Sequence, residues 1–432
     1  MLSEKSFMGA VENMRHRRAS VIFVLITMFI DVLGMGLVIP ILPRLVQNLL
    51  GDDVAEASFV FGLLVSVYAV MQFLCAPVLG ALSDRFGRRP VILLALLGLG
   101  FDYVLLSLAP SIWWLVLGRI VAGIFGATFT PAGAYIADVS PPEKRAANFG
   151  LMGIAFGLGF IAGPALGGLL GEANLRLPFI VCAGLTFANF LFGLLVMPES
   201  LRPENRRAIN ISQMNPIGAL RAVWRYRGVA AMVPVFVAAQ LAQQGLQSVW
   251  VPYTTYRYGW GVAGVGVSLA IVGLLFAVSQ GAVVRPMVKR FGEKSTLLVS
   301  LVVASVGMLL FGLATEGWMM YAVTALYCLG LGLLNPTAQA LMSQAVPPNE
   351  QGLLQGAMTS VMTAAAIVGP PVANGSFALF ISPQSPLALP GAPFFLGSVL
   401  CLAALVCAWR SSTHTGSQAT TPRESLAGVV AS

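Results

Sequence analysis

Long apolar runs alternate with short polar breaks along almost the whole chain. Each run is close to the ~20 residues that a helix needs to cross the hydrocarbon core of a bilayer. A long polar break at 198–228 has six runs before it and six after it. The runs lie at 20–43, 59–81, 91–109, 112–137, 147–170, 178–197, 229–252, 262–284, 296–314, 319–345, 353–380 and 393–409. The pattern therefore predicts an all-α integral membrane protein with twelve transmembrane helices in two six-helix halves.

The polar segments define the expected organisation of the chain. We predict a leader at 1–19, a first half at 20–197, a central loop at 198–228, a second half at 229–409 and a disordered tail at 410–432. The tail is rich in Ser, Thr and Gly and is too polar to form a core. The first apolar run is too long for a signal peptide and has no small-residue cleavage site, so we expect it to be retained.

Composition supports a membrane protein and excludes a large soluble enzyme. Of the 432 residues, 57% are hydrophobic and 10% are charged, whereas soluble domains carry about 25% charged residues. The cysteines lie inside apolar runs without Cys-x-x-Cys spacing, and the two histidines lie in the polar termini. Neither a metal site nor a disulfide framework is expected from this pattern.

The net charge of +8 follows a topological pattern. If both termini lie inside, the outer loops hold Arg44, Arg176 and Arg257, Arg119 lies within a span, and the remaining 21 of the 25 Lys and Arg residues lie on the inner side. Basic loops are retained in the cytoplasm, so this distribution predicts cytoplasmic termini. It also gives the positive charge a role at the membrane surface, so nucleic acid is not expected as a partner.

A short motif occurs twice, at corresponding places in the two predicted halves. Arg85-Phe86-Gly87 follows the second apolar run, and Arg290-Phe291-Gly292 follows the eighth. A repeated tripeptide is weak evidence alone, but in the same loop of two six-span halves it favours a duplicated, pseudo-symmetric fold.

Three charged residues lie inside the apolar runs: Asp31 in the first, Asp102 in the third and Arg119 in the fourth. A charge near the bilayer centre costs at least ~2.5 kcal/mol, so such residues usually mark a transport pathway. Asp138, at the inner end of the fourth run, is a weaker candidate. The second half has no acidic residue inside its runs, so any carboxylate that binds a coupling proton belongs to the first half.

Two interpretations of Asp31 are open. It either forms a permanent ion pair with Arg119 or gains and loses a proton, and we favour the second because polar groups in spans are usually functional. For Asp102 the structural and the functional interpretation are about equally favoured, because its position near the outer half of the third run allows contact with water. Arg119 does not deprotonate. We therefore expect it to set the pKa of the carboxylate, or to replace the positive charge of the proton when the carboxylate releases it.

The loop from Gly80 to Pro90 is rich in charge and lies on the inner side. It is either a solvated charge run or an inner gate, and we favour a gate because an acid and three arginines lie between two spans. The gate residues are Gly80, Asp84, Arg85, Gly87, Arg88 and Arg89.

The fifth run is rich in glycine and contains a proline. Small residues allow close helix packing, and proline interrupts the helical hydrogen bonds, so the run is interpreted as a packing surface, a hinge, or both. The residues concerned are Gly153, Gly157, Gly163, Pro164, Gly167 and Gly168.

Neutral polar and aromatic residues within the spans are candidates for a midplane cavity that binds an amphipathic molecule. Taken singly, each polar one is more often part of an interhelical hydrogen bond. The candidates are Gln72, Phe129, Gln240, Gln244, Trp250, Phe276, Gln280 and Asn335.

Asp31 with its following glycines and Pro40, the Gly80 to Pro90 loop, Arg119 and the Gly163 to Gly168 stretch together resemble the drug:proton antiporters of the major facilitator superfamily. Within that branch the chain is most similar to bacterial tetracycline efflux antiporters, especially over 20–170. The resemblance implies that Asp84 and Arg85 serve the inner gate and that Asp31 and Asp102 belong to the transport path. It also implies that Arg119 assists proton coupling and that Gln72 and Gln280 contact substrate. Together with the residue-based argument above, this makes Asp31, Asp102 and Arg119 the predicted proton-coupling residues. The resemblance further implies a bacterial inner-membrane location, a small-molecule substrate, the proton as coupling ion without another cofactor, and a monomer.

Two positions depart from that resemblance. The tetracycline exporters have a histidine in the eighth span, where this chain has Phe276, and an aspartate in the ninth, where it has Ala304. Both groups are tied in that family to movement of protons and metal-chelated drug. Their absence puts tetracycline itself in question as the substrate and leaves antiport through the first-half acids possible.

The sequence thus predicts a proton-coupled exporter of amphipathic drugs. The first alternative is a metabolite or sugar carrier of the same fold, against which the glycine-rich fifth run argues. The second is a membrane enzyme or sensor, but the loops have neither a cluster of catalytic residues nor room for a catalytic domain.

Overall fold

The computed structural model describes residues 21–126, 128–201, 203–206, 226–347 and 350–415. The predicted leader at 1–19 and most of the central loop and of the tail lie outside these residues. The predicted organisation of those segments is not tested.

Helices make up nearly all of the described chain. The first half contains a helix at 21–38 followed by α2 (Leu42–Leu49), α3 (Val54–Phe86), α4 (Arg88–Leu108), α5 (Ile112–Phe125), α6 (Phe129–Val139), α7 (Pro142–Ala173) and α8 (Leu177–Val196). A short 3-10 helix, η1 (Pro203–Asn205), follows. The second half contains α10 (Arg227–Tyr258), α11 (Val262–Val278), the π-helical segment η3 (Ser279–Val283), α12 (Val284–Leu313), α13 (Gly317–Gln344), α14 (Gln351–Ile381) and α15 (Ala392–Thr415).

Within the described residues, 11 helical stretches are long and apolar enough to cross a membrane. One of them, Val262–Leu313, has 52 residues and is interrupted by the non-helical backbone of Gly292. It therefore supplies two spans, which accounts for the twelve that the sequence predicts. The all-α membrane architecture is confirmed.

The helices are longer than the apolar runs. For example, α3 begins at Val54 and α15 continues to Thr415, so residues 410–415 of the predicted tail are helical. A helix satisfies its own backbone hydrogen bonds in water as well as in lipid, so the apolar run marks only the part that lies within the membrane.

The fourth span is broken, which the sequence analysis did not predict. Helix α5 ends at Phe125 and α6 begins at Phe129. The N–H of Gly126 bonds to the carbonyl of Ala122 at 2.7 Å and closes α5. The carbonyl of Thr128 then accepts the N–H of Ala132 at 3.0 Å, so α6 begins as a separate helix.

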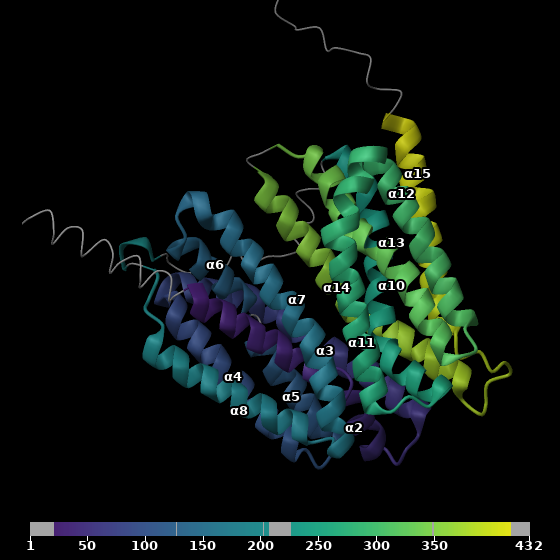
Figure 1. Cartoon of the computed structure of the whole chain (residues 1–432), viewed down its shortest axis with the longest axis horizontal. Coiled ribbons are helices and arrows are strands. Elements are labelled where there is room, and N and C mark those ends of the chain that lie inside the picture. The colour runs from purple at the N-terminus through teal and green to yellow at the C-terminus, as the bar shows by residue number, and fades with distance from the viewer. Residues whose placement is uncertain (1–20, 127, 202, 207–225, 348–349, 416–432) are drawn as a thin grey trace, which may run out of the picture.

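The two halves lie side by side, and α2 lies at one end of their junction (Figure 1). They meet where α3 packs on α14 and α7 packs on α11. A Cβ on Gly62 would approach the carbonyl oxygen of Pro370 to 2.9 Å, and one on Gly266 would approach Cα of Gly168 to 2.9 Å. Glycine at these crossings lets the backbones of the two halves touch.

The repeated tripeptide adopts the same conformation in both halves. Gly87 has φ 110° and ψ 162°, and Gly292 has φ 74° and ψ 165°. The guanidinium carbon of Arg85 lies 5.2 Å from the ring centre of Phe86, and that of Arg290 lies 5.4 Å from Phe291. Positive φ favours glycine, so the local structure supports the predicted duplication.

The glycines of α7 fall into two groups. An added Cβ on Gly163 would approach backbone atoms of the first helix to 2.7 Å and one on Gly167 would approach them even more closely, while one on Gly168 would approach Val262 at the start of α11 to 2.9 Å. At Gly153 and Gly157, an added Cβ would meet no atom of the described structure within 4 Å. Close packing therefore explains Gly163, Gly167 and Gly168 and is wrong for Gly153 and Gly157, while the predicted hinge is not tested.

Candidate functional site

A cavity of about 380 Å³ lies between the halves. The first helix, α3, α4 and α5 line it from the first half, and α10 and α14 line it from the second. Its wall includes Asp31, Asp102 and Arg119. The structure thus brings the three intramembrane charges, which are far apart in the sequence, to one site.

Arg119 pairs with Asp102. Its Nη2 lies 3.6 Å from Asp102 Oδ2, and its guanidinium lies over the ring of Tyr68, 5.8 Å from the centre. Asp102 is 1% exposed. The structure therefore places Arg119 between an acid and an aromatic face, and the permanent Asp31–Arg119 pair that the sequence left open is not the arrangement found.

Asp31 has a different partner. Its Oδ2 accepts a hydrogen bond from Oγ1 of Thr128 at 2.6 Å. Its Oδ1 is buried and has no hydrogen-bond partner among the described residues. Asp31 is thus a carboxylate in the cavity wall with one oxygen held and one available to bind a proton or a ligand group.

Two of the predicted substrate residues, Gln72 and Gln244, line the cavity. Gln72 donates to the hydroxyl of Tyr68 at 3.1 Å. The cavity wall also contains residues that the sequence analysis did not single out, namely Tyr68, Tyr103, Gln247 and Ser248. Amide, hydroxyl and aromatic groups provide the mixture of contacts that an amphipathic molecule needs.

The other predicted substrate residues lie elsewhere. Gln240 donates to Asn335 at 3.2 Å, Trp250 is 4% exposed within the core of the second half, and Phe276 packs against the same core. Gln280 is exposed in η3. Phe129 begins α6, but its side chain lies outside the described structure. The sequence does not reveal which face of each helix points toward the cavity. For this reason several predicted substrate residues do not line it.

At the end of the molecule that the sequence predicts to be outer, the halves are joined. Arg44 donates to the carbonyl of Trp260 at 3.2 Å, and Ala263 N–H donates to Glu172 at 3.2 Å. Deeper between the halves, Ser58 donates to Asn374 Oδ1 at 3.0 Å. These contacts close the predicted outer side of the cavity.

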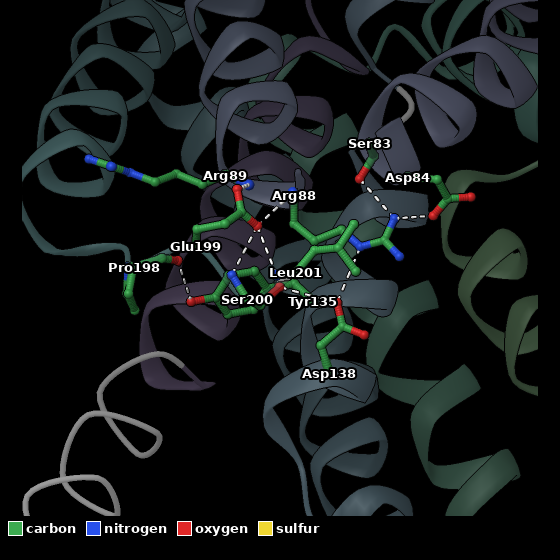
Figure 2. A network of polar contacts seen from close by, with 10 residues as sticks. All are labelled: Ser83, Asp84, Arg88, Arg89, Tyr135, Asp138, Pro198, Glu199, Ser200 and Leu201. Carbon is green, nitrogen blue, oxygen red and sulfur yellow. Dashed lines mark hydrogen bonds and ion pairs between the residues drawn. The ribbon is translucent and has the colours of Figure 1, made fainter. Parts of the chain in front are cut away.

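The predicted inner gate forms a polar network in the first half (Figure 2). Arg88 is 9% exposed; it bonds to Asp138 at 3.2 Å and to Ser83 at 3.1 Å, and it also pairs with Asp84. Buried guanidinium groups need several acceptors, so Arg88 is the centre of this network.

The sequence analysis missed Glu199, which completes the same network (Figure 2). Its carboxylate accepts the backbone N–H groups of Arg88 at 2.9 Å and Arg89 at 3.3 Å. A Cβ on Gly87 would collide with this carboxylate. Glycine is therefore needed at this position both because no side chain fits beside Glu199 and because φ is positive. Arg85 is exposed, and a Cβ added to Gly80 would lie 3.6 Å from Cγ2 of Thr130, an ordinary contact distance.

Arg88→Gln is expected to slow transport about tenfold. The ion pairs of Arg88 are expected to stabilise one conformation of the transporter by about 1.4 kcal/mol, and losing that energy changes the equilibrium between conformations about tenfold. The measurement is initial drug uptake into inverted vesicles at matched protein level. Arg206→Gln, which changes an exposed arginine of the central loop, is the control and should stay within about twofold of the parent. Equal effects of the two changes would contradict the central role of Arg88.

Within the described residues, no group of three or more His, Cys, Asp and Glu side chains could hold a metal ion.

Two helical bundles with a cavity between them that is lined by charged residues are the architecture of a secondary transporter. The chain belongs to the Major Facilitator Superfamily, whose family model matches residues 24–285 and 239–431. It is therefore a multi-pass membrane protein with a lipid environment and a small-molecule substrate.

Relatives and solved structures support this assignment. The chain is 42% identical to the class C tetracycline resistance protein of Escherichia coli, over 92% of this chain and 99% of that protein. It is 39% identical to the class G tetracycline resistance protein of Vibrio anguillarum, over 82% of this chain and 89% of that protein. A crystal structure of a bacterial homologue of the human lysosomal transporter Spinster, inward-facing and occupied, matches with a TM-score of 0.75 at 15% identity, over 92% of this chain and 97% of that one, which supports the fold. The resemblance to the tetracycline exporters is confirmed.

Proposed function

We propose that the protein is a proton-coupled antiporter that exports amphipathic small molecules or drugs across the bacterial inner membrane. Both termini are cytoplasmic, the working unit is a monomer, the proton is the coupling ion without another cofactor, and nucleic acid plays no part. The chain is a transporter and not an enzyme. The observation that carries the proposal is that Asp31, Asp102 and Arg119 share the wall of one cavity between the halves.

The relatives favour drug efflux over the main alternative. Those named for tetracycline resistance confirm the prediction of a drug-efflux member of this superfamily, and they do not favour a metabolite or sugar carrier.

The charges suggest how the exchange works. Two carboxylates and one guanidinium leave a net charge of minus one in the cavity when both acids are ionised. One proton on Asp31 neutralises the cluster, and its release restores a carboxylate that attracts a cationic group or accepts a hydrogen bond from a neutral amphipathic molecule. Asp102 pairs with Arg119 at 3.6 Å, whereas Asp31 lies in the cavity wall with Thr128 as its hydrogen-bond partner. We therefore assign the exchanged proton to Asp31.

The membrane potential makes a single proton sufficient. It is worth about 2.3 kcal/mol per charge per 100 mV, which for a neutral drug exchanged for one proton supports accumulation of up to about fiftyfold.

The substrate is not assumed to be tetracycline. The two departures from the tetracycline exporters are apolar here: Ala304 is buried at 1% exposure and Phe276 packs against the core. Neither can bind a proton or a chelated metal. We therefore propose an amphipathic drug that is transported without a chelated metal.

A drug panel tests the proposal. Expression in a drug-sensitive bacterial host is expected to raise the growth-inhibiting concentration of one or more amphipathic drugs at least about fourfold, with tetracyclines included for comparison. Uptake of the affected drug into inverted vesicles should collapse when a proton uncoupler is added, because the driving force disappears. Transport that ignores the uncoupler would favour a facilitator, and the absence of any transported drug in proteoliposomes would contradict the proposal.

A further inference from the structure

The break in the fourth span places two functional contacts on one broken helix. Before the break, α5 carries Arg119, which pairs with Asp102. At the break, Thr128 donates to Asp31 at 2.6 Å. The two acids of the cavity are therefore both held by the fourth span.

Thr128 is used in an unusual way. Threonine before a helix normally caps it by accepting a backbone N–H two or three residues on. Here Thr128 precedes α6, yet its side chain makes no capping hydrogen bond to that helix. One reason is that the third residue of α6 is Pro131, which has no N–H to offer. Thr128 is 3% exposed, and its hydroxyl donates a hydrogen bond to Asp31 instead.

Helix α6 joins this contact to the inner network. It is 11 residues long and so spans about 16 Å. Thr128 lies directly before its first residue, and Asp138, the partner of Arg88 at 3.2 Å, is its second-last residue. A short rigid helix with a contact at each end can carry displacement from one to the other.

We propose that Thr128 is a positioning residue for proton exchange, which holds the Asp31 carboxylate and, through α6, transmits its protonation to the Arg88–Asp138 ion pair. This inference rests on the proposed antiport function. An ionised carboxylate accepts the threonine hydroxyl strongly, and a protonated one accepts it less well. Proton binding therefore loosens the start of α6, and the far end of the helix shifts against Arg88.

The charged and titratable groups that face Asp31 come from three other elements. They share the cavity wall with it and are Tyr68 on α3, Asp102 and Tyr103 on α4, and Arg119 on α5. Cys182 on α8 lies nearby and points its thiol at the carbonyl of Gly34, 3.8 Å away. None of these groups changes in the variants used below, so a change in pH dependence reports on the Thr128 contact.

The experiment is drug exchange in proteoliposomes with equal pH on both sides, repeated across a pH series. Thr128→Val removes the hydroxyl and keeps the branched shape; Thr128→Ser keeps the hydroxyl. The half-maximal pH of exchange should rise by about one unit in Thr128→Val, because only the ionised acid loses a donor. It should stay at the parent value in Thr128→Ser and in the matched control Thr130→Val, which changes an exposed threonine of the same helix.

The transmission step has its own test. Asp138→Asn should shift the half-maximal pH in the parent and shift it less in the Thr128→Val background, since coupled sites are not additive. No shift in the parent, or equal shifts in both backgrounds, overturns transmission through α6.

The two levels of the hypothesis fail differently. If the parent exchanges no drug, or does so without any pH dependence, the antiport proposal fails. If the parent shows pH-dependent exchange and Thr128→Val keeps its midpoint, or Thr128→Ser shifts as far as Thr128→Val, only the role of Thr128 is overturned.

Discussion

Asp31→Asn is expected to abolish uphill drug export, reducing the accumulation ratio in energised inverted vesicles to about one. An amide has the shape of the carboxyl group and accepts the Thr128 hydroxyl, but it cannot bind and release a proton at neutral pH. The loss should therefore be confined to coupling: downhill drug flux should persist while the response to an imposed pH gradient disappears. The measurement is fluorescent drug uptake with and without that gradient.

The control for this change is Asp52→Asn, in the loop before α3. Asp52 has φ 69°, a conformation that asparagine also tolerates, so this substitution removes an acid without straining the backbone. It should transport as the parent does. Uphill accumulation by Asp31→Asn at the parental level would show that another group carries the proton.

Arg119→Gln is expected to destabilise the protein by about 3 to 5 kcal/mol, because removing one partner of a buried pair leaves an uncompensated charge. Asp102 is 1% exposed, and both its carboxylate oxygens lack hydrogen bonds among the described residues. The guanidinium 3.6 Å away is therefore its main compensation. The measurement is thermal unfolding of the purified protein in detergent.

A double change separates charge from shape. Asp102→Asn combined with Arg119→Gln removes both charges and should recover most of the lost stability, since a neutral pair carries no such penalty. Arg285→Gln, at an exposed position of α12, should have little effect. A double variant less stable than Arg119→Gln alone would rule out the ion pair as the cause.

The membrane architecture was predictable because hydropathy reports directly on the environment of each segment. The twelve spans, the two halves and the repeated Arg-Phe-Gly loop all follow from patterns within about twenty neighbouring residues. Asp31, Asp102 and Arg119 were identifiable because a charge in an apolar run is costly wherever the run lies.

The pairing of those charges was not predictable. The sequence suggested Arg119 as the partner of Asp31. In the structure Arg119 forms an ion pair with Asp102, and Asp31 accepts a hydrogen bond from Thr128. Which side chains meet depends on the rotation of each helix about its axis, and a run that is apolar all round has no periodicity to reveal it.

Glu199 and the break before α6 were missed for related reasons. A glutamate after a span looks like any solvated loop residue until the fold brings it to the backbone of Arg88. The break had a local signal, Gly126 and Pro131, but apolar character continues across it and the run reads as one span.

The sequence by itself determined that the chain spans a membrane, how many times, in which two halves, and which three charges lie inside the spans. These are consequences of the free energy of transfer into lipid, which acts on each segment separately. The tertiary structure decided which face of each helix lines the cavity, which acid is paired and which is held by Thr128, and how α6 connects the cavity to the gate. Those properties depend on contacts between distant segments, which exist only when the helices pack.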